Sequence, residues 1–309
     1  MKAAICTRYG LPEVLQLKEV SKPVPADNEV LVKVHATTVS VADVRVRGFR
    51  VPWWFWLQAR MLLGLLRPKN AILGSELAGE VESVGKEVQQ FKKGDAVFAS
   101  MNRQFGAYAE YRCLPEDAVM ALKPSNTTFE EAATLPFGGL TALHFLRLGG
   151  IRSGQKVLVY GASGSVGGSA VQLAKAFGAA VTAVCSTANV ELVRSLGADS
   201  VVDYTKDDFA DSSEKYDIIF DAVGKTSRSR SKRVLRQGGK FVSVMSGNAK
   251  LRAEDLVFLK ELVEAGKLRP VIDRRYPMER IADAHRYVDG GHKKGNVVIA
   301  VRSGEKSEA

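Results

Sequence analysis

Residues 156–186 read KVLVYGASGSVGGSAVQLAKAFGAAVTAVCS, and this stretch decides the fold. It opens with an apolar run too short for a typical helix, residues 157–160, and then breaks at Gly161, Gly164 and Gly167. An amphipathic pattern follows, and a second β-rich run closes the stretch. The order strand, glycine-rich turn, helix, strand predicts one βαβ unit with a phosphate-binding turn at its first junction.

This turn suits a dinucleotide for two physical reasons. Glycines let the backbone come close to a pyrophosphate, and the N–H groups and dipole at the start of the following helix attract its charge. The spacing is G-x-x-G-x-x-G instead of the commoner G-x-G-x-x-G, so its position between a strand and a helix is what favours dinucleotide binding. A tight structural turn is the alternative.

Length and composition indicate an ordinary globular protein. The 309 residues, 46% hydrophobic and 25% charged, suit about two domains. Cys6, Cys113 and Cys185 are widely separated and odd in number, which favours neither a disulfide framework nor a zinc cluster. The first residues lack a long apolar core, so we expect no secretory signal and a reducing, cytoplasmic location.

The formal net charge of +10 is compatible with nucleic acid, an anionic membrane or a phosphorylated small molecule as partner. Much of this charge lies in residues 225–240, KTSRSRSKRVLRQGGK. Because the run lacks the interleaved aromatic residues that stack on bases, we interpret it as a solvated helix face and predict no nucleic-acid partner.

The pattern of the chain changes near residue 124. Residues 1–124 are β-rich, with many turn residues, and suit a small barrel or folded sheet. Strands are predicted there at Lys2–Cys6, Glu29–Thr38 and Leu77–Val84. From residue 125 to residue 269 strands alternate with helices, which predicts an α/β fold with a doubly wound parallel sheet. Residues 270–309 return to β character with one short helix, Met278–Tyr287, and should pack back on the first domain.

The predicted parallel sheet has five strands where a full sheet of this type has six. They are expected at residues 157–160, 181–184, 201–203, 217–221 and 240–244. After the last of them the chain enters a helix at Ala253 almost directly, and no sixth strand fits in Asn248–Arg252. Ahead of the sheet, Thr127–Leu148 predicts a helix in two pieces around Pro136, with Thr127 or Thr128 as its first cap.

Residues 51–68, VPWWFWLQARMLLGLLRP, hold all three tryptophans. Gln58 and Arg60 interrupt the apolar run, so it is too short to span a bilayer and no integral membrane segment is predicted. We interpret it as an aromatic-rich helix that roofs a pocket between the domains. A role confined to the core, or a position on a membrane surface, are the alternatives.

The residues after the second strand of the βαβ unit indicate which cofactor is bound. In NAD-binding sheets an acidic side chain there holds the ribose 2′-hydroxyl, but this chain reads VCSTAN at residues 184–189. Ser186 and Thr187 can donate to a 2′-phosphate without adding negative charge, and Arg194 can neutralise it. The sequence therefore favours NADP(H), although Ser186 and Thr187 suit an ordinary loop and Arg194 a solvated helix position.

Nearly the whole chain resembles the medium-chain dehydrogenase/reductase superfamily, in its zinc-free quinone oxidoreductase-like (zeta-crystallin-like) branch. The motifs that carry the resemblance are GSELAGEVESVGKEV (74–88), FKKGDAVF (91–98), GAYAEY (106–111), LPFGGLTAL (135–143), the glycine turn, SLGADSVVDY (195–204) and FDAVG (220–224). The resemblance implies a GroES-like substrate domain, residues 1–124 completed by 270–309, and an NADP-binding Rossmann domain at 125–269.

The resemblance also implies which residues contact the cofactor. Thr141 would lie beside the nicotinamide phosphate, Tyr204 would contact the 2′-phosphate, and Val223 would touch the adenine or ribose side. Asn189 stands where several relatives carry lysine, which leaves more of the 2′-phosphate to its neighbours. The full predicted set is Thr141, Gly161, Ser163, Gly164, Ser165, Val166, Ser186, Asn189, Arg194, Tyr204, Val223 and Asn296.

At the positions of the family's catalytic zinc ligands this chain has Ser40 and Ser75, and neutral serine is a poor ligand. We therefore predict no metal. Hydride transfer from NADPH would then need an already electrophilic acceptor, a quinone or an α,β-unsaturated carbonyl. Ser40 is a candidate donor to the acceptor oxygen and Asp43 a candidate orienting residue, with a loop residue and a helix cap as their alternatives.

The acceptor pocket is predicted from aromatic residues. Trp53, Trp54 and Phe55 suit a flat or aliphatic acceptor. Some quinone reductases of the family carry a tyrosine near the position of Phe49, which argues against simple quinone activity. The alternative function is a sensor or interaction protein that binds NADPH with little turnover. Because the family's sixth strand pairs across the dimer, its loss predicts an open edge and a weakened homodimer.

Overall fold

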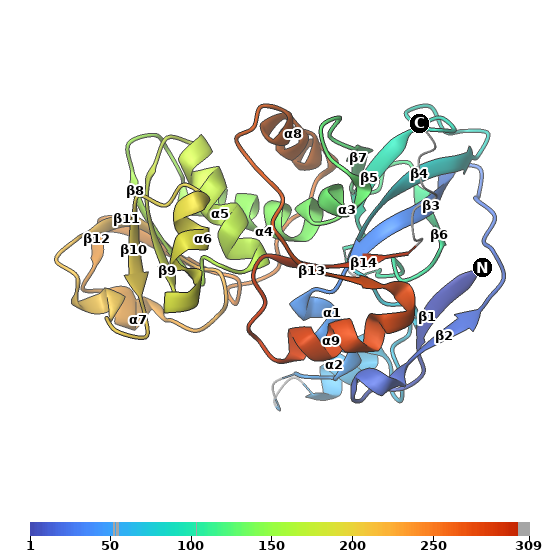
Figure 1. The fold of residues 1–309 in the computed structure, drawn as a ribbon, viewed down its shortest axis with the longest axis horizontal. Helices are drawn as coiled ribbons and strands as arrows, with labels where there is room; N and C mark the ends of the chain where they lie inside the picture. Colours follow the sequence, from blue (N-terminus) through green and yellow to red (C-terminus); the bar gives the residue numbers. More distant parts are fainter. Residues whose placement is uncertain (52, 54–55, 103, 302–309) are drawn as a thin grey trace. The chain divides into compact units, whose positions relative to one another are not determined.

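The computed structural model describes residues 1–51, 53, 56–102 and 104–301 (Figure 1). The chain forms two compact units, one made of Met1–Pro136 with the chain from Ile272 onward, the other of Phe137–Val271. The first unit is therefore discontinuous in sequence. The assignment of these parts as substrate and NADP-binding domains stays a prediction.

The second unit is built on a parallel five-stranded sheet, in the order β10-β9-β8-β11-β12. Its strands are β8 (Lys156–Tyr160), β9 (Ala180–Cys185), β10 (Ser200–Asp203), β11 (Tyr216–Asp221) and β12 (Leu235–Ser243). The predicted fold class and the absence of a sixth strand within residues 137–271 are confirmed. The strand order reverses beside β8, so the carboxyl ends of β8 and β11 border the crevice where such sheets bind ligands.

The helices of this unit follow the expected crossovers. They are α4 (Leu135–Gly149), α5 (Ser165–Ala176), α6 (Val190–Ser195), α7 (Arg228–Ser231) and α8 (Ala253–Glu264). Ahead of α4, the short helix α3 (Phe129–Ala132) begins with the predicted cap, since Thr128 and Glu131 form a reciprocal capping box. Pro136 falls in the first turn of α4, where a missing N–H costs nothing.

The basic run at residues 225–240 differs from its interpretation as one helix face. It contains the single-turn helix α7 and then the first half of β12. Arg230, Arg233 and Arg236 each form an ion pair with an aspartate at the surface. The basic charge is therefore partly neutralised where it is densest.

The first unit has a seven-stranded sheet and a separate two-stranded one. The larger sheet runs β13-β14-β3-β4-β5-β7, with β6 also paired to β3. Its strands are β3 (Glu29–Thr38), β4 (Glu76–Val84), β5 (Ala96–Ser100), β6 (Tyr111–Pro115), β7 (Met120–Leu122), β13 (Ile272–Pro277) and β14 (Asn296–Ala300), and the smaller sheet pairs β1 (Lys2–Cys6) with β2 (Leu15–Glu19). Because β14 pairs with β3, the predicted return of the C-terminal segment to the first domain is confirmed.

The helices of this unit are α1 (Val41–Arg47), α2 (Trp56–Leu63) and α9 (Ile281–Asp289), with single 3-10 turns at Pro12–Val14 and Met278–Arg280. The helix predicted at Met278–Tyr287 thus begins as a 3-10 turn. None of the helices in the described ranges is long and apolar enough to cross a membrane.

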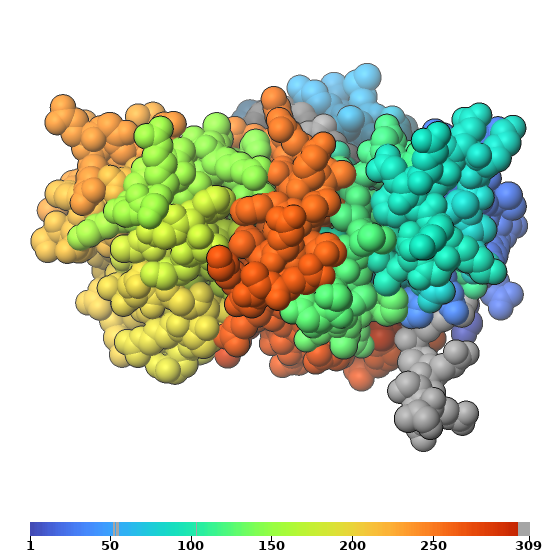
Figure 2. All heavy atoms as spheres, turned by 90° about the horizontal axis from the view of Figure 1, so that it is seen from above, coloured from blue at the N-terminus to red at the C-terminus, as the bar shows by residue number. Residues whose placement is uncertain are grey.

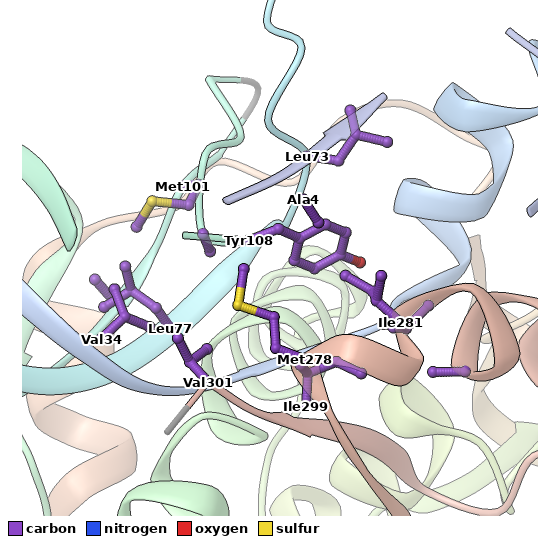
Figure 3. Packing of buried hydrophobic residues seen from close by; sticks show 14 of the residues in the cluster. Ala4, Val34, Leu73, Leu77, Met101, Tyr108, Met278, Ile281, Ile299 and Val301 are labelled. Atoms are coloured by element: carbon purple, nitrogen blue, oxygen red, sulfur yellow. The ribbon is translucent and has the colours of Figure 1, made fainter. Parts of the chain in front are cut away.

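One apolar core joins the two sequence segments of this unit (Figure 3). Leu77 from β4 and Tyr108 from the segment between β5 and β6 are buried with Met278, Ile281 and Ile299 from the C-terminal segment. Each large side chain buried in this way contributes roughly 1.5–3 kcal/mol. The C-terminal strands are therefore part of the folding unit of residues 1–136.

Candidate functional site

The glycine turn after β8 has the conformation that its sequence requires. Gly161 adopts φ +80°, and its N–H donates to the carbonyl oxygen of Val184 at 3.0 Å. A Cβ atom at Gly161 would lie 2.5 Å from Cγ1 of Val223. Both the left-handed backbone and the crowding exclude a larger residue, so the carboxyl ends of β8 and β11 approach each other closely.

Gly167 lets the first turn of α5 rest directly on this loop. A Cβ atom there would lie 2.8 Å from Cα of Ala162 and closer still to the carbonyl oxygen of Gly161. Gly164 is the N-cap of α5 and has no side chain to cap the helix. A Cβ atom at Gly164 would have the carbonyl oxygen of Gly161, at 3.8 Å, as its nearest neighbour. The space beside Gly164, at the start of α5, is therefore open.

These features fit the pyrophosphate of a dinucleotide. α5 is 12 residues long, has no acidic residue in its first turn, and begins with the buried residues Ser165 and Val166. Its positive dipole end is therefore uncompensated by a carboxylate and faces the space that Gly164 leaves. Ser163, in the same turn, is half-buried.

The end of β9 brings two predicted residues together. Ser186 follows the strand, and its hydroxyl accepts a hydrogen bond from the Asn189 amide at 3.0 Å. The other two predicted phosphate contacts are Tyr204 and Arg194, on the segments that follow. Tyr204 is 53% exposed, with its N–H donating to the carbonyl of Cys185, and Arg194 pairs with Glu191 at the surface of α6.

Sequence reasoning missed one carboxylate near this loop. Asp203 ends β10, where it is the register partner of Cys185. It accepts hydrogen bonds from the hydroxyls of Thr187 and Thr205, and these bonds lower the pKa of its carboxyl group. The prediction considered only residues along β9 and its loop, but the negative charge comes from the neighbouring strand. It also removes Thr187 as a donor, because that hydroxyl already serves Asp203.

A second carboxylate, Asp221, shapes the loop after β11. It is fully buried and accepts hydrogen bonds from the backbone N–H groups of residues 223–226 and from the Ser243 hydroxyl. This network fixes the position of Val223, which lies against Gly161. The motif FDAVG was the available signal, but only its valine was predicted to matter.

Two further predicted residues lie elsewhere. Thr141 is half-buried in α4, one turn after Gly138. A Cβ atom at Gly138 would lie 2.8 Å from the carbonyl oxygen of Ser165, so this part of α4 packs against the start of α5. Asn296 is buried at the start of β14 in the first unit.

The first unit holds a buried polar cluster of Ser40, Asp43 and Ser75, which we call the serine–aspartate cluster. Ser40 is the N-cap of α1 and forms a capping box with Asp43. The Ser40 hydroxyl donates to Asp43 at 2.5 Å, and the Ser75 hydroxyl lies 3.1 Å from both partners. The N–H of Gly74 donates to the second carboxylate oxygen at 3.1 Å. Burial raises the pKa of Asp43, although these donors oppose the shift.

This geometry gives Ser40 and Asp43 the cap role that was their alternative interpretation. The hydroxyl hydrogen of Ser40 already points to a carboxylate, so a direct role toward an acceptor oxygen stays a prediction. The hydroxyl groups of Ser40 and Ser75 are uncharged, and uncharged hydroxyl oxygens are poor zinc ligands. Nearby, Glu76 is fully buried and accepts a hydrogen bond from Thr38.

His285 and His35 both pack against aromatic side chains. His285 is fully buried, lies 3.1 Å from the Tyr108 hydroxyl, and has its pKa lowered to about 3 by burial, with the Arg47 charge as a smaller cause. The ring of His35 stacks on Phe129. Within the residues that the model describes, no group of three or more His, Cys, Asp or Glu side chains is arranged to hold a metal ion.

The aromatic segment is only partly helical. Within the predicted helix over residues 51–68, Trp56–Leu63 form α2, which ends before Gly64 because that residue adopts φ +120°. Phe49 has a left-handed backbone (φ +48°) and packs on Tyr9 and Arg60. Trp53 is 84% exposed. The predictions for Trp54 and Phe55 lie outside the described residues.

Comparisons with known proteins match both parts of the chain. Residues 26–124 match the alcohol dehydrogenase GroES-like domain family, and residues 196–299 match the zinc-binding dehydrogenase family. The chain is 36% identical over 324 residues to a 2-methylene-furan-3-one reductase of Solanum lycopersicum, covering 97% of this chain and 79% of that protein. It is 34% identical to the chloroplastic NADPH-dependent alkenal/one oxidoreductase of Arabidopsis thaliana, with the same coverage.

Solved structures agree with this likeness. The quinone oxidoreductase from Coxiella burnetii superposes with a TM-score of 0.83 at 27% identity, over 98% of this chain and 99% of that chain. The human quinone oxidoreductase is 30% identical in sequence, over 97% of each chain. The match to the Coxiella burnetii structure therefore extends over both units of the present chain.

Proposed function

Since this chain belongs to the medium-chain dehydrogenase/reductase superfamily, in its quinone oxidoreductase-like branch, we propose that it reduces α,β-unsaturated carbonyl compounds with NADPH. The serine–aspartate cluster is the observation that carries this proposal. Where zinc-dependent relatives hold a metal that polarises a carbonyl, this chain has two hydroxyls bonded to a buried carboxylate. The acceptor must therefore be electrophilic by its own conjugation.

The glycine turn supports a nicotinamide dinucleotide as the hydride source. Gly161 and Gly167 bring the backbone together, and Gly164 leaves room for a pyrophosphate at the positive end of α5. When bound, the cofactor supplies two electrons and one hydrogen as hydride. The turn orients the dinucleotide, and holding both reactants in place supplies much of the acceleration.

We infer a preference for NADP(H) from the end of β9. Ser186 and Asn189 form a polar pair that can donate to a 2′-phosphate, and the exposed Tyr204 and Arg194 lie on the segments that follow. Asp203 opposes a phosphate electrostatically, but Thr187 and Thr205 occupy its oxygens. The name of the Arabidopsis thaliana relative supports the same preference.

The proposed reaction balances without a metal. Hydride adds to the carbon β to the carbonyl, and the C=C electron pair moves toward the carbonyl to give an enolate. A proton from the solvent then adds to the α carbon and completes the saturated ketone or aldehyde. Asp43 accepts hydrogen bonds from the Ser40 and Ser75 hydroxyls and, with Ser40, caps the start of α1. A quinone is the second acceptor class, favoured by relatives named quinone oxidoreductases but opposed by Phe49 in place of a tyrosine.

An acceptor panel tests this proposal. We expect purified protein to oxidise NADPH with alkenals and enones, more slowly with quinones, and not with saturated ketones or aldehydes. NADPH affinity is measured in parallel, and treatment with a chelator should leave the rates unchanged. Tight NADPH binding without turnover on any acceptor would favour the sensor interpretation, and chelator-sensitive reduction of saturated ketones would contradict the metal-free chemistry.

A further inference from the structure

An exposed apolar surface lies outside the cofactor turn and the serine–aspartate cluster. Among the described residues, 17 large hydrophobic side chains are exposed, and seven of them belong to the segment 53–66. We call these seven the Trp53–Leu66 surface: Trp53, Trp56, Leu57, Met61, Leu62, Leu65 and Leu66. Their exposed fractions run from 48% for Trp56 to 84% for Trp53. A contiguous sequence segment with so many exposed apolar side chains marks an interaction site.

The inner side of α2 anchors this surface to the first unit. Ala59 is its one buried residue, and the Arg60 guanidinium lies 4.0 Å from the centre of the Phe49 ring and 4.9 Å from that of Trp56. Four apolar side chains of this helix are exposed, those of Trp56, Leu57, Met61 and Leu62. Figure 1 shows the position of α2 in the chain. The light-blue atoms at the upper margin of Figure 2 belong to this part of the chain. The apolar side chains are therefore held on a fixed support rather than on a loose tail.

The chain segment that carries this surface has charged side chains of one sign only. From Val44 to Ser75 the chain contains no aspartate or glutamate, whereas it contains six arginines and lysines. Arg47 and Arg50 pair with Asp289, and Arg60 is held by aromatic rings. The remaining three, Arg45, Arg67 and Lys69, flank the surface in sequence and are exposed, and we call them the basic rim. The surface thus combines apolar insertion groups with a rim of positive charge.

We propose that the Trp53–Leu66 surface docks this protein onto an anionic lipid bilayer. Leucine, methionine and tryptophan side chains would enter the boundary between headgroups and acyl chains, while the basic rim contacts the headgroups. The net charge of +10 adds long-range attraction to such a membrane. A second copy of the chain is a poorer occupant, because an isologous contact would bring two positive rims together.

The tryptophans make docking directly measurable. All three, at positions 53, 54 and 56, belong to this segment, so intrinsic tryptophan fluorescence reports on no other part of the chain. We expect vesicles of equimolar phosphatidylcholine and phosphatidylglycerol to shift the emission to the blue and to carry the protein on flotation. Vesicles of phosphatidylcholine alone should bind at least about tenfold more weakly, since each basic residue near an anionic surface contributes about a factor of five.

Variants separate the two contributions. Leu57→Glu with Met61→Glu should reduce binding to the anionic vesicles at least about tenfold, because two acyl-inserting side chains become charged. Val24→Glu is the matched control, since Val24 is also 84% exposed but lies outside the surface. Arg67→Gln with Lys69→Gln should weaken binding and flatten its salt dependence. NADPH affinity should be unchanged in all of them, which shows that each variant is folded.

Three outcomes would overturn the proposal. One is equal binding of the Leu57→Glu/Met61→Glu variant and the control variant to anionic vesicles. Another is binding to phosphatidylcholine as tight as binding to the anionic mixture. The last is that the parent protein and the Val24→Glu control sediment as dimers, whereas the Leu57→Glu/Met61→Glu variant sediments as a monomer. The surface would then be covered by a second copy of the chain.

Discussion

Gly167→Ala tests whether the contact between α5 and the glycine turn holds the cofactor half of the molecule together. The added Cβ would lie 2.8 Å from Cα of Ala162, where carbon atoms normally approach to 3.5–4.0 Å, and closer still to the Gly161 carbonyl oxygen. Both obstacles are backbone atoms, so neither can rotate away. Relief requires α5 to move off the turn.

The expected cost is about 3 kcal/mol of unfolding free energy, the upper part of the usual range for overpacking. Alanine would otherwise gain roughly 0.5–1 kcal/mol inside a helix, so the observed loss is net of that gain. Gly168→Ala is the matched control on the same helix, because its Cβ would meet only Leu196 Cδ1 at 3.3 Å and the Ala162 oxygen at 3.6 Å. We expect that variant to stay within about 1 kcal/mol of the parent.

Gly164→Ala separates stability from cofactor binding. Its Cβ has no neighbour nearer than 3.8 Å, so the fold should be unaffected. If a pyrophosphate occupies this space, NADPH affinity should fall at least about tenfold, which corresponds to about 1.4 kcal/mol. Urea unfolding and NADPH fluorescence titration measure the two quantities. Equal stabilities of Gly167→Ala and Gly168→Ala, or unaltered NADPH binding by Gly164→Ala, would refute the reasoning.

Three further predictions concern other parts of the chain. Asp43→Ala should cost about 3 kcal/mol in urea unfolding, since buried donors on Ser40 and Ser75 lose their acceptor, whereas the exposed Glu191→Ala should cost under about 0.5 kcal/mol. His285 stays neutral in the folded protein down to about pH 3, while the unfolded chain binds its proton near pH 6.5. Stability should therefore fall by about 3 kcal/mol between pH 6.5 and pH 4, and a His285→Gln variant should lose that part of the pH dependence in acid unfolding curves; an unchanged slope would contradict it. Ser186→Asp should lower the ratio of NADPH to NADH affinity at least about tenfold in binding titrations, and an unchanged ratio would place the 2′-phosphate elsewhere.

Local sequence patterns predicted the elements that local forces determine. The strands Lys2–Cys6 and Glu29–Thr38 have the expected bounds, because alternating or continuous apolar runs end there at turn residues. The βαβ unit followed from its glycines and from two short apolar runs. The capping box at Thr128 was readable from the spacing of its two members.

Contacts between distant residues were not predictable from local patterns. Asp203 reaches the loop after β9 only because the register of two parallel strands places it opposite Cys185. Ser75 joins Ser40 and Asp43 only because strand pairing in the first unit brings residues more than thirty positions apart together. The motif resemblance named both serines, but their shared carboxylate emerged only from the packing.

The open edge of the parallel sheet has a structure that bears on the predicted weakened dimer. Along β12, Leu235 pairs with Tyr216 and Lys240 with Ile218, so residues 236–239 form a bulge. Gly238 lies in this bulge with φ +77°, and Arg236 beside it pairs with Asp217. Bulges and charged residues twist an edge strand away from partners and make its backbone a poor template for pairing. The bulge covers only residues 236–239, the first part of this edge, and residues 240–243 pair regularly with β11. We therefore expect strand-to-strand pairing along this edge to be weak, and the weakened homodimer stays a prediction.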